Sequence, residues 1–162
     1  MRWLIFSYEQ DSIVKQCDDM LHVVGQTVIH EHHHGKSSIE DVKAKIAQHQ
    51  PNRIIVIAND EKSEQDHSLL TTLNDHLLIP LYVGQATINT YSPIPVLLLT
   101  FTTRNEPSDS LSPTDIVQNA TDELINIYPH IIKYVKQFLF FLSKADFCSL
   151  VQNFSHQSRT KT

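Results

Sequence analysis

The chain has 162 residues, of which 41% are hydrophobic and 19% charged, a composition that argues against a disordered protein and predicts one domain. Its net charge of −5 argues against a broad basic face for duplex nucleic acid, although a small nucleotide needs only a few local donors. No stretch approaches the roughly 20 apolar residues of a membrane span, and the first apolar run is too short for a signal peptide, so a cytoplasmic protein with no membrane partner is expected.

The predicted strands and helices alternate along the chain. Short apolar runs are typical of strands buried on both faces, and stretches with apolar residues about every three to four positions are typical of helices. Capping residues, glycines and prolines mark several helix ends. In chain order the sequence predicts a strand at 3–8, a helix over 13–24, a strand at 26–32, a helix over 37–50, a strand at 53–58, a helix over 63–77, a short strand at 81–83, a strand at 96–101, a helix over 112–127 and a last helix over 130–154.

This alternation predicts the fold class. Each connection between strands is long enough for a crossover, which favours a three-layer, Rossmann-like α/β fold. We expect a mostly parallel sheet of four to five strands, helices on both faces and a C-terminal helical pair. Residues 1–154 would form this single domain, and residues 155–162 a flexible tail. Neither a G-x-G-x-x-G after the first strand nor a Walker A sequence occurs.

Polar side chains follow the ends of the predicted strands. Ligands of open α/β sheets bind beyond the carboxyl ends of the strands, where loops lead into helix N-termini. The hydroxyls, amides and two cations there suit an oxygen-rich anion, so we expect a nucleotide or another small phosphate-bearing ligand. Asp60 could equally cap the next turn instead of contacting a ligand. Lys36 and Arg104 could equally lie in solvated loops. The predicted ligand contacts are Ser7, Ser37, Asn59, Asp60 and Arg104, with His34 and Lys36 as catalytic candidates.

Four histidines lie in the segment 30–34, at the end of the second predicted strand. Side chains alternate along a strand, so His30, His32 and His34 share one face, and the residues between them share the other. Three imidazoles are the ligand set of many catalytic zinc sites, and Asp60 could complete it. Residues two apart on a flat strand are separated by about 6.6 Å, which favours chelation by two histidines over three. A metal-dependent hydrolase or metal-binding protein, with a divalent transition metal, is one alternative function.

A second interpretation of the same histidines needs no metal. His34 and Lys36 precede a helix whose free backbone N–H groups attract phosphate. His34 would act as general acid or base on a phosphodiester, and Lys36 would neutralise charge. A third interpretation is a polar edge strand whose histidines face solvent.

The last predicted helix carries more apolar surface than one packed face requires. Residues 138–142 are apolar on every side of such a helix. This pattern indicates burial against a second copy of the chain, since two-fold homodimers are the commonest oligomers. Deep burial within one domain is the alternative. A non-catalytic subunit that assembles through this helix is therefore the other alternative function.

The expected outline is a small Rossmann-like domain, a homodimer, with polar strand ends. In topology it resembles CARF-type domains, which bind cyclic oligonucleotides and in some cases cleave them. No motif carries this resemblance. It implies a nucleotide ligand over the strand ends.

Overall fold

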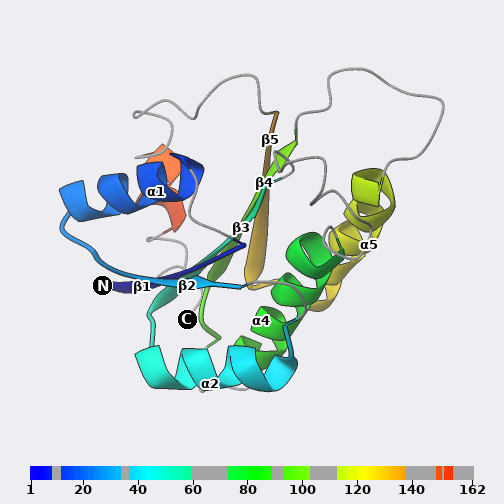
Figure 1. Ribbon diagram of the computed structural model, residues 1–162, viewed down its shortest axis with the longest axis horizontal. Helices are drawn as coiled ribbons and strands as arrows, with labels where there is room; N and C mark the ends of the chain where they lie inside the picture. Colours follow the sequence, from blue (N-terminus) through cyan, green and yellow to red (C-terminus); the bar gives the residue numbers. More distant parts are fainter. Residues whose placement is uncertain are drawn as a thin grey trace.

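The computed structural model describes residues 1–8, 12–33, 37–59, 73–88, 93–102, 113–137, 149–150 and 152–154. These residues form strands and helices that alternate along the chain (Figure 1). Their order is β1 (Arg2–Ser7), α1 (Ser12–Val23), β2 (Thr27–His32), α2 (Ile39–His49), β3 (Arg53–Asn59), the π-helix η2 (Asn74–Leu78), α4 (Ile79–Ile88), β4 (Val96–Thr102), α5 (Pro113–Ile127) and β5 (Ile131–Gln137).

The five strands form one parallel sheet in the order β2-β1-β3-β4-β5. Helix α1 and the helical residues near the C-terminus cover one face of the sheet, and α2, α4 and α5 cover the other (Figure 1). The predicted three-layer α/β fold with helices on both faces is confirmed. Within the part of the chain that the structure describes, no helix is both long and apolar enough to cross a membrane.

The core is divided by the sheet into two apolar clusters. On the α1 face, Trp3 of β1 packs against α1 and against the ring of Phe154, with ring centroids 5.5 Å apart. On the other face, Leu4 and Phe6 pack with residues of α2 and α4. Residues 3–6 of β1 alternate between the two clusters, and each is at most 2% exposed. This explains why the first apolar run predicts a central strand so clearly.

The last predicted helix, residues 130–154, is wrong over its first part. The chain forms strand β5 from Ile131 to Gln137, which pairs with β4, so there is no C-terminal helical pair of the expected kind. The stretch is rich in β-branched and aromatic residues, which favour a strand, and a place beside β4 is open to it. The helical spacing of Ile131 and Val135 is therefore a coincidence. Residues 138–148, which include the expected dimer surface, lie outside the described residues.

The short strand predicted at 81–83 is also wrong, because these residues lie in α4. The helix before it was expected to stop ahead of Pro80, but the chain continues from η2 directly into α4. Proline has no N–H to donate, and the carbonyl oxygen of His76, four residues before Pro80, accepts a hydrogen bond from Oγ1 of Thr121 instead. Here Pro80 stands where the π-helical bonding of η2 gives way to α-helical bonding, so it does not end the helix.

Candidate functional site

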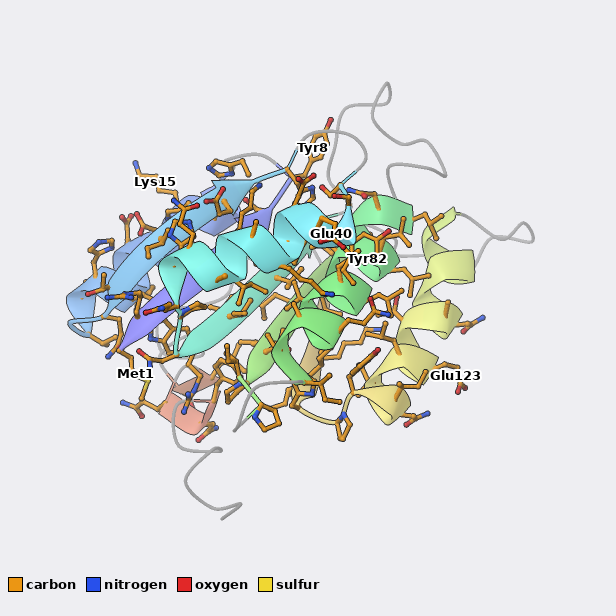
Figure 2. The ribbon with its side chains drawn as sticks, turned by 90° about the horizontal axis from the view of Figure 1, so that it is seen from below. Met1, Tyr8, Lys15, Glu40, Tyr82 and Glu123 are labelled. Carbon is orange, nitrogen blue, oxygen red and sulfur yellow. The ribbon has the colours of Figure 1, made fainter. Side chains whose placement is uncertain are left out.

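The connections of the sheet reverse direction at the carboxyl end of β1. From β1 the chain crosses through α1 to β2 on one side of β1, and from β2 it crosses through α2 to β3 on the other side of β1. Such a reversal is the topological switch point at which open α/β sheets bind ligands. Figure 2 shows Tyr8, the residue after β1, at the same end of the molecule as Glu40 at the start of α2.

Ser7 ends β1 at this switch point and is only 2% exposed. Its Oγ lies 3.0 Å from Nδ1 of His32, the residue beside it in β2. The carbonyl oxygen of Ser7 accepts a hydrogen bond of 2.8 Å from the backbone N–H of His33. The buried His33 ring lies edge-on to the Tyr8 ring. The end of β1 is thus tied to the end of β2 through both side chain and backbone.

The predicted alternation of the histidines is confirmed for the residues that the structure describes. The rings of His30 and His32 stack, with centroids 6.0 Å apart. Nε2 of His30 lies 3.1 Å from Oδ1 of Asp18 in α1, and the same oxygen lies 3.0 Å from Nδ1 of His22. β2 is an edge strand, as one interpretation expected, but His30 and His32 are directed at groups within the protein and do not simply face solvent.

Glu31 lies on the opposite face of β2 and connects it to α2. Its carboxylate accepts a hydrogen bond of 2.6 Å from Nε2 of His49 and lies 3.5 Å from Nζ of Lys45. Partial burial alone would raise the pKa of Glu31, but the hydrogen bond from His49 and the charge of Lys45 outweigh it, and the pKa is lowered. Edge strand β2 is therefore held from both sides by pairs of ionisable groups.

The metal-binding interpretation finds no support in this geometry. Among the described residues, no three or more His, Cys, Asp or Glu side chains are arranged to hold a metal ion. One ring nitrogen of His30 is directed at Asp18, and one of His32 at Ser7. The third expected ligand, His34, lies outside the described residues.

Two buried polar side chains on the α2 and α4 face of the sheet were not predicted from the sequence. Asn74, in η2, is 3% exposed, and its Oδ1 accepts a hydrogen bond of 3.3 Å from the backbone N–H of Ser37. Thr100, toward the carboxyl end of β4, is 2% exposed. Within the described part of the chain, neither Nδ2 of Asn74 nor Oγ1 of Thr100 has a hydrogen-bond partner. Buried polar groups of this kind need an explanation, and a ligand is one.

The surroundings of Asn74 hold it in place. π-Helical turns are rare and occur often at functional sites. Oγ1 of Thr121 in α5 donates a hydrogen bond of 2.8 Å to the carbonyl oxygen of His76 in η2, so α5 fixes this turn. The sequence signal was an asparagine after the apolar Leu73, at a position where a helix that faces the core normally carries another apolar side chain.

The start of α2 differs from the phosphate site expected at the strand–helix junction. Ser38 caps α2, and its Oγ accepts a hydrogen bond of 3.2 Å from the backbone N–H of Asp41. Glu40 and Asp41 place two carboxylates in the first turn, where they already compensate the helix dipole. The N–H of Ser37 is bound to Asn74. Ser37 therefore has a described role in positioning the junction.

The remaining predicted contacts are only partly placed by the structure. Asn59 ends β3 beside Phe101 of β4, at the carboxyl edge, but its side chain is not described. The catalytic candidates His34 and Lys36, and the predicted ligand contacts Asp60 and Arg104, lie outside the described residues. Their roles stay predictions.

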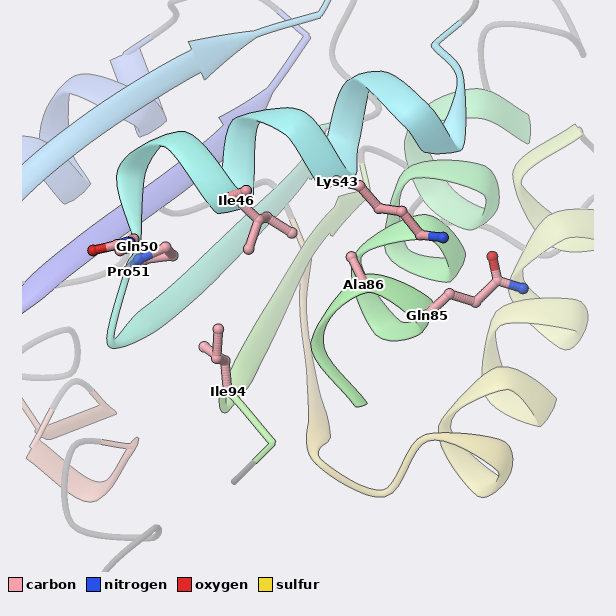
Figure 3. Close-up of a pocket in the computed structure, with 8 residues that line it drawn as sticks. Lys43, Ile46, Gln50, Pro51, Gln85, Ala86 and Ile94 are labelled. Atoms are coloured by element: carbon pink, nitrogen blue, oxygen red, sulfur yellow. The ribbon is translucent and has the colours of Figure 1, made fainter. Parts of the chain in front are cut away.

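A groove of about 520 Å³ lies at the opposite end of the sheet, between α2 and α4 (Figure 3). Pro51 and Ile94, which precede β3 and β4, place it at the amino ends of these strands. Its floor is mostly apolar, and Figure 3 shows Lys43 and Gln85 reaching along one side. The residues that line it are Lys43, Ile46, Ala47, Gln50, Pro51, Gln85, Ala86 and Ile94.

Comparisons with known proteins support the fold. No protein-family model matches the chain, and no curated protein sequence matches it significantly. The L780 UDP-rhamnose synthase of Acanthamoeba polyphaga mimivirus has a similar structure, with 19% identity, a TM-score of 0.60, and coverage of 85% of this chain and 56% of the viral enzyme. The dTDP-4-dehydrorhamnose reductase of Bacillus anthracis, solved with NADP, gives 10% identity, a TM-score of 0.59 and coverage of 83% and 52%.

A third similar structure is a short-chain dehydrogenase/reductase from Brucella ovis. It gives 11% identity, a TM-score of 0.56, and coverage of 98% of this chain and 93% of that protein. At these identities the likeness shows a shared Rossmann-type fold. The chain spans only a little over half the length of the viral and Bacillus enzymes.

Proposed function

We propose that this domain binds a nucleotide or another small phosphate-bearing ligand over the carboxyl ends of its strands. The observation that carries the proposal is that two buried polar atoms, Nδ2 of Asn74 and Oγ1 of Thr100, have no partners among the described residues. Leaving a buried donor unpaired costs about 1–3 kcal/mol, and a ligand oxygen would remove that cost. Both groups lie on the same side of the sheet, on segments that lead to its carboxyl edge, where α/β proteins bind ligands.

The similar structures add support to this proposal. The Bacillus reductase was solved with NADP, and the name of the viral enzyme contains a nucleotide, UDP. The likeness to CARF-type domains also implies a nucleotide, and no observation tests it.

Cleavage of the ligand is the finer part of the proposal. A histidine would act as general acid or base on a phosphodiester, with His34 and Lys36 as the candidates from the sequence. Nδ1 of the described His32 is occupied by Ser7. Hydrolysis of bis(p-nitrophenyl) phosphate that disappears in His34→Ala would support cleavage. Absence of turnover by the wild-type protein would leave a binding domain.

The binding proposal is tested by thermal unfolding with inorganic phosphate, AMP and UMP as separate probes. A ligand present at about 100 times its Kd stabilises the native state by about 2.7 kcal/mol, so a binding probe raises the Tm in a concentration-dependent way. Thr100→Val, nearly equal in volume, should reduce the shift. Thr87→Val is the matched control, because Thr87 is buried in α4 and its hydroxyl already has partners in Val83 and His130.

Three outcomes separate the possibilities for this site. A Tm shift that Thr100→Val weakens and Thr87→Val preserves supports the proposal. A shift with any probe that both variants preserve places the ligand elsewhere. No shift with any of the three probes contradicts phosphate-ligand binding.

The alternative functions expected from the sequence stay predictions. Uptake of a transition metal by untagged protein, lost in His30→Ala, would support a metal site. Self-association through the residues after β5 would support an interaction subunit.

A further inference from the structure

Dinucleotide-binding Rossmann domains need a particular turn after their first strand. The pyrophosphate lies at the N-terminus of the following helix, and the turn is glycine-rich, with the pattern G-x-G-x-x-G. One glycine makes the tight turn, one lets the backbone approach the pyrophosphate, and one lets helix and strand pack closely. Each of these roles depends on the absence of a side chain.

In this chain the corresponding segment runs from Ser7, the last residue of β1, to Ser12, the first residue of α1. Its sequence is Ser-Tyr-Glu-Gln-Asp-Ser, with no glycine at any position. Two carboxylates, Glu9 and Asp11, lie in the connection where the fingerprint provides uncharged backbone. Like charges placed near a binding site disfavour an anion there, and a pyrophosphate carries negative charge.

The described end of β1 is itself occupied by side chains. Ser7 is buried, and its Oγ is bound to Nδ1 of His32 at 3.0 Å. The His32 ring stacks on His30, which is directed at Asp18 of α1. Side chains from β2 and α1 are thus connected to Ser7 at the end of β1. A glycine at this position would have no side chain to make such a contact. The Ser7–His32 contact lies at the strand end where the glycine-rich turn of a dinucleotide site begins.

The group implied by the fold therefore does not fit the residues present. We propose that this domain keeps the fold of dinucleotide-dependent reductases but does not bind NAD(H) or NADP(H). Its ligand is a phosphate-bearing compound with no dinucleotide pyrophosphate over α1, contacted from the opposite face of the sheet by Asn74 and Thr100. The identity of the ligand class rests on the proposed function, whereas the exclusion of dinucleotides does not.

The direct test is titration of the purified chain with NADH and with NADPH, followed by fluorescence of the reduced nicotinamide. We expect no saturable binding up to about 1 mM of either dinucleotide. Saturable binding of either one in that range would overturn the inference. AMP, UMP and inorganic phosphate are titrated in parallel by thermal unfolding. If all three fail, the proposed function fails and the exclusion of dinucleotides stands; if NADH binds, only the exclusion fails.

A gain-of-function variant tests the assigned cause. The substitutions Ser7→Gly, Glu9→Gly and Ser12→Gly together create G-x-G-x-x-G at the required place. The matched control is Glu9→Gln with Asp11→Asn, which removes both charges and leaves every side chain volume nearly unchanged. We expect the triple variant to bind NADH at least about tenfold more tightly than wild type, and the control to gain less.

Two results would contradict that cause. If the triple variant and the control gain NADH affinity equally, the charges alone would exclude the dinucleotide. No gain in either, with native circular dichroism and cooperative unfolding in the control, would show that the turn and its charges do not exclude the dinucleotide.

Discussion

At the scale of single residues, two buried threonines differ in one respect that matters for the site. The hydroxyl of Thr87 donates to the carbonyl oxygen of Val83 at 2.7 Å and lies 2.8 Å from Nε2 of His130. The hydroxyl of Thr100 has no partner among the described residues. An unpaired buried hydroxyl lowers the stability of the free protein, and a ligand that binds it regains that cost.

This difference predicts opposite effects of the same substitution without ligand. Thr87→Val should lower the free energy of unfolding by about 1–2 kcal/mol, because it removes hydrogen bonds of a buried hydroxyl. Thr100→Val should leave it unchanged or raise it by up to about 1 kcal/mol. Urea denaturation of the two variants measures both values. Equal destabilisation would show that Thr100 is already satisfied within the protein.

A second prediction at this scale concerns the close packing around Gly84 in α4. A Cβ at this position of α4 would lie 3.1 Å from Cδ1 of Ile131 and 3.1–3.2 Å from ring atoms of Tyr128. Gly84→Ala should therefore destabilise the protein by about 1–3 kcal/mol despite the higher helix propensity of alanine. Tyr128→Ala in the same chain should relieve part of that cost. A stabilising Gly84→Ala would show that the ring moves away without penalty.

At the scale of elements, the attachment of edge strand β2 to α2 should depend on pH. The pKa of Glu31 is lowered in the native state, so its ionised form stabilises the fold. Such a group contributes stability above its ordinary pKa of 4.5, and the contribution disappears as the pH falls through the lowered native value.

Glu31→Gln should accordingly cost about 1 kcal/mol at pH 6 and nothing once Glu31 is protonated in both states. The measurement is urea unfolding of both proteins as a function of pH. Repeating the comparison in a His49→Ala background isolates the Glu31–His49 interaction. The cost of Glu31→Gln in the free energy of unfolding should be smaller there, because His49 supplies the hydrogen bond of 2.6 Å. A cost that does not depend on pH would contradict this account of β2.

Most elements could be predicted from the sequence because their patterns have one physical reading. The runs that became β1, β3 and β4 are mostly apolar, as is typical of central strands of a parallel sheet. β5 was missed because Ile131, Val135 and their neighbours also fit a helical period, and only the free position beside β4 decides between the two. The unusual entry into α4 was missed because π-helical bonding around Pro80 has no sequence signature of its own.

The site was less predictable than the fold. Strand alternation correctly placed His30 and His32 on one face of β2 and Glu31 on the other, because the direction of side chains along a strand depends on local geometry alone. The importance of Asn74 could not be predicted, because its partner Ser37 lies 37 positions away in the sequence and meets it only in the folded chain. The sequence has serines at both 37 and 38, and only the folded chain shows that Ser38 caps α2.

At the scale of the whole molecule, self-association stays a prediction. β5 lies at an edge of the sheet, and the apolar residues 138–142 follow it directly in the chain. A strand edge that is open to solvent and next to an apolar segment would favour pairing with another copy. Light scattering coupled to size-exclusion chromatography should show a dimer for wild type and a monomer for Phe140→Glu, with Glu123→Gln on α5 as the control. A wild-type monomer would contradict the expected homodimer.

The central claim is that a small phosphate-bearing ligand is contacted by Asn74 near the carboxyl edge of the sheet. The most direct measurement is a two-dimensional amide NMR titration with UMP, in which the side-chain NH₂ of Asn74 and the backbone amide of Ser37 are followed. Saturable shifts of these signals, with little change at Lys43 and Ala86 in the distant groove, are the predicted result. Shifts confined to the groove residues, or no shifts at all, would contradict the claim.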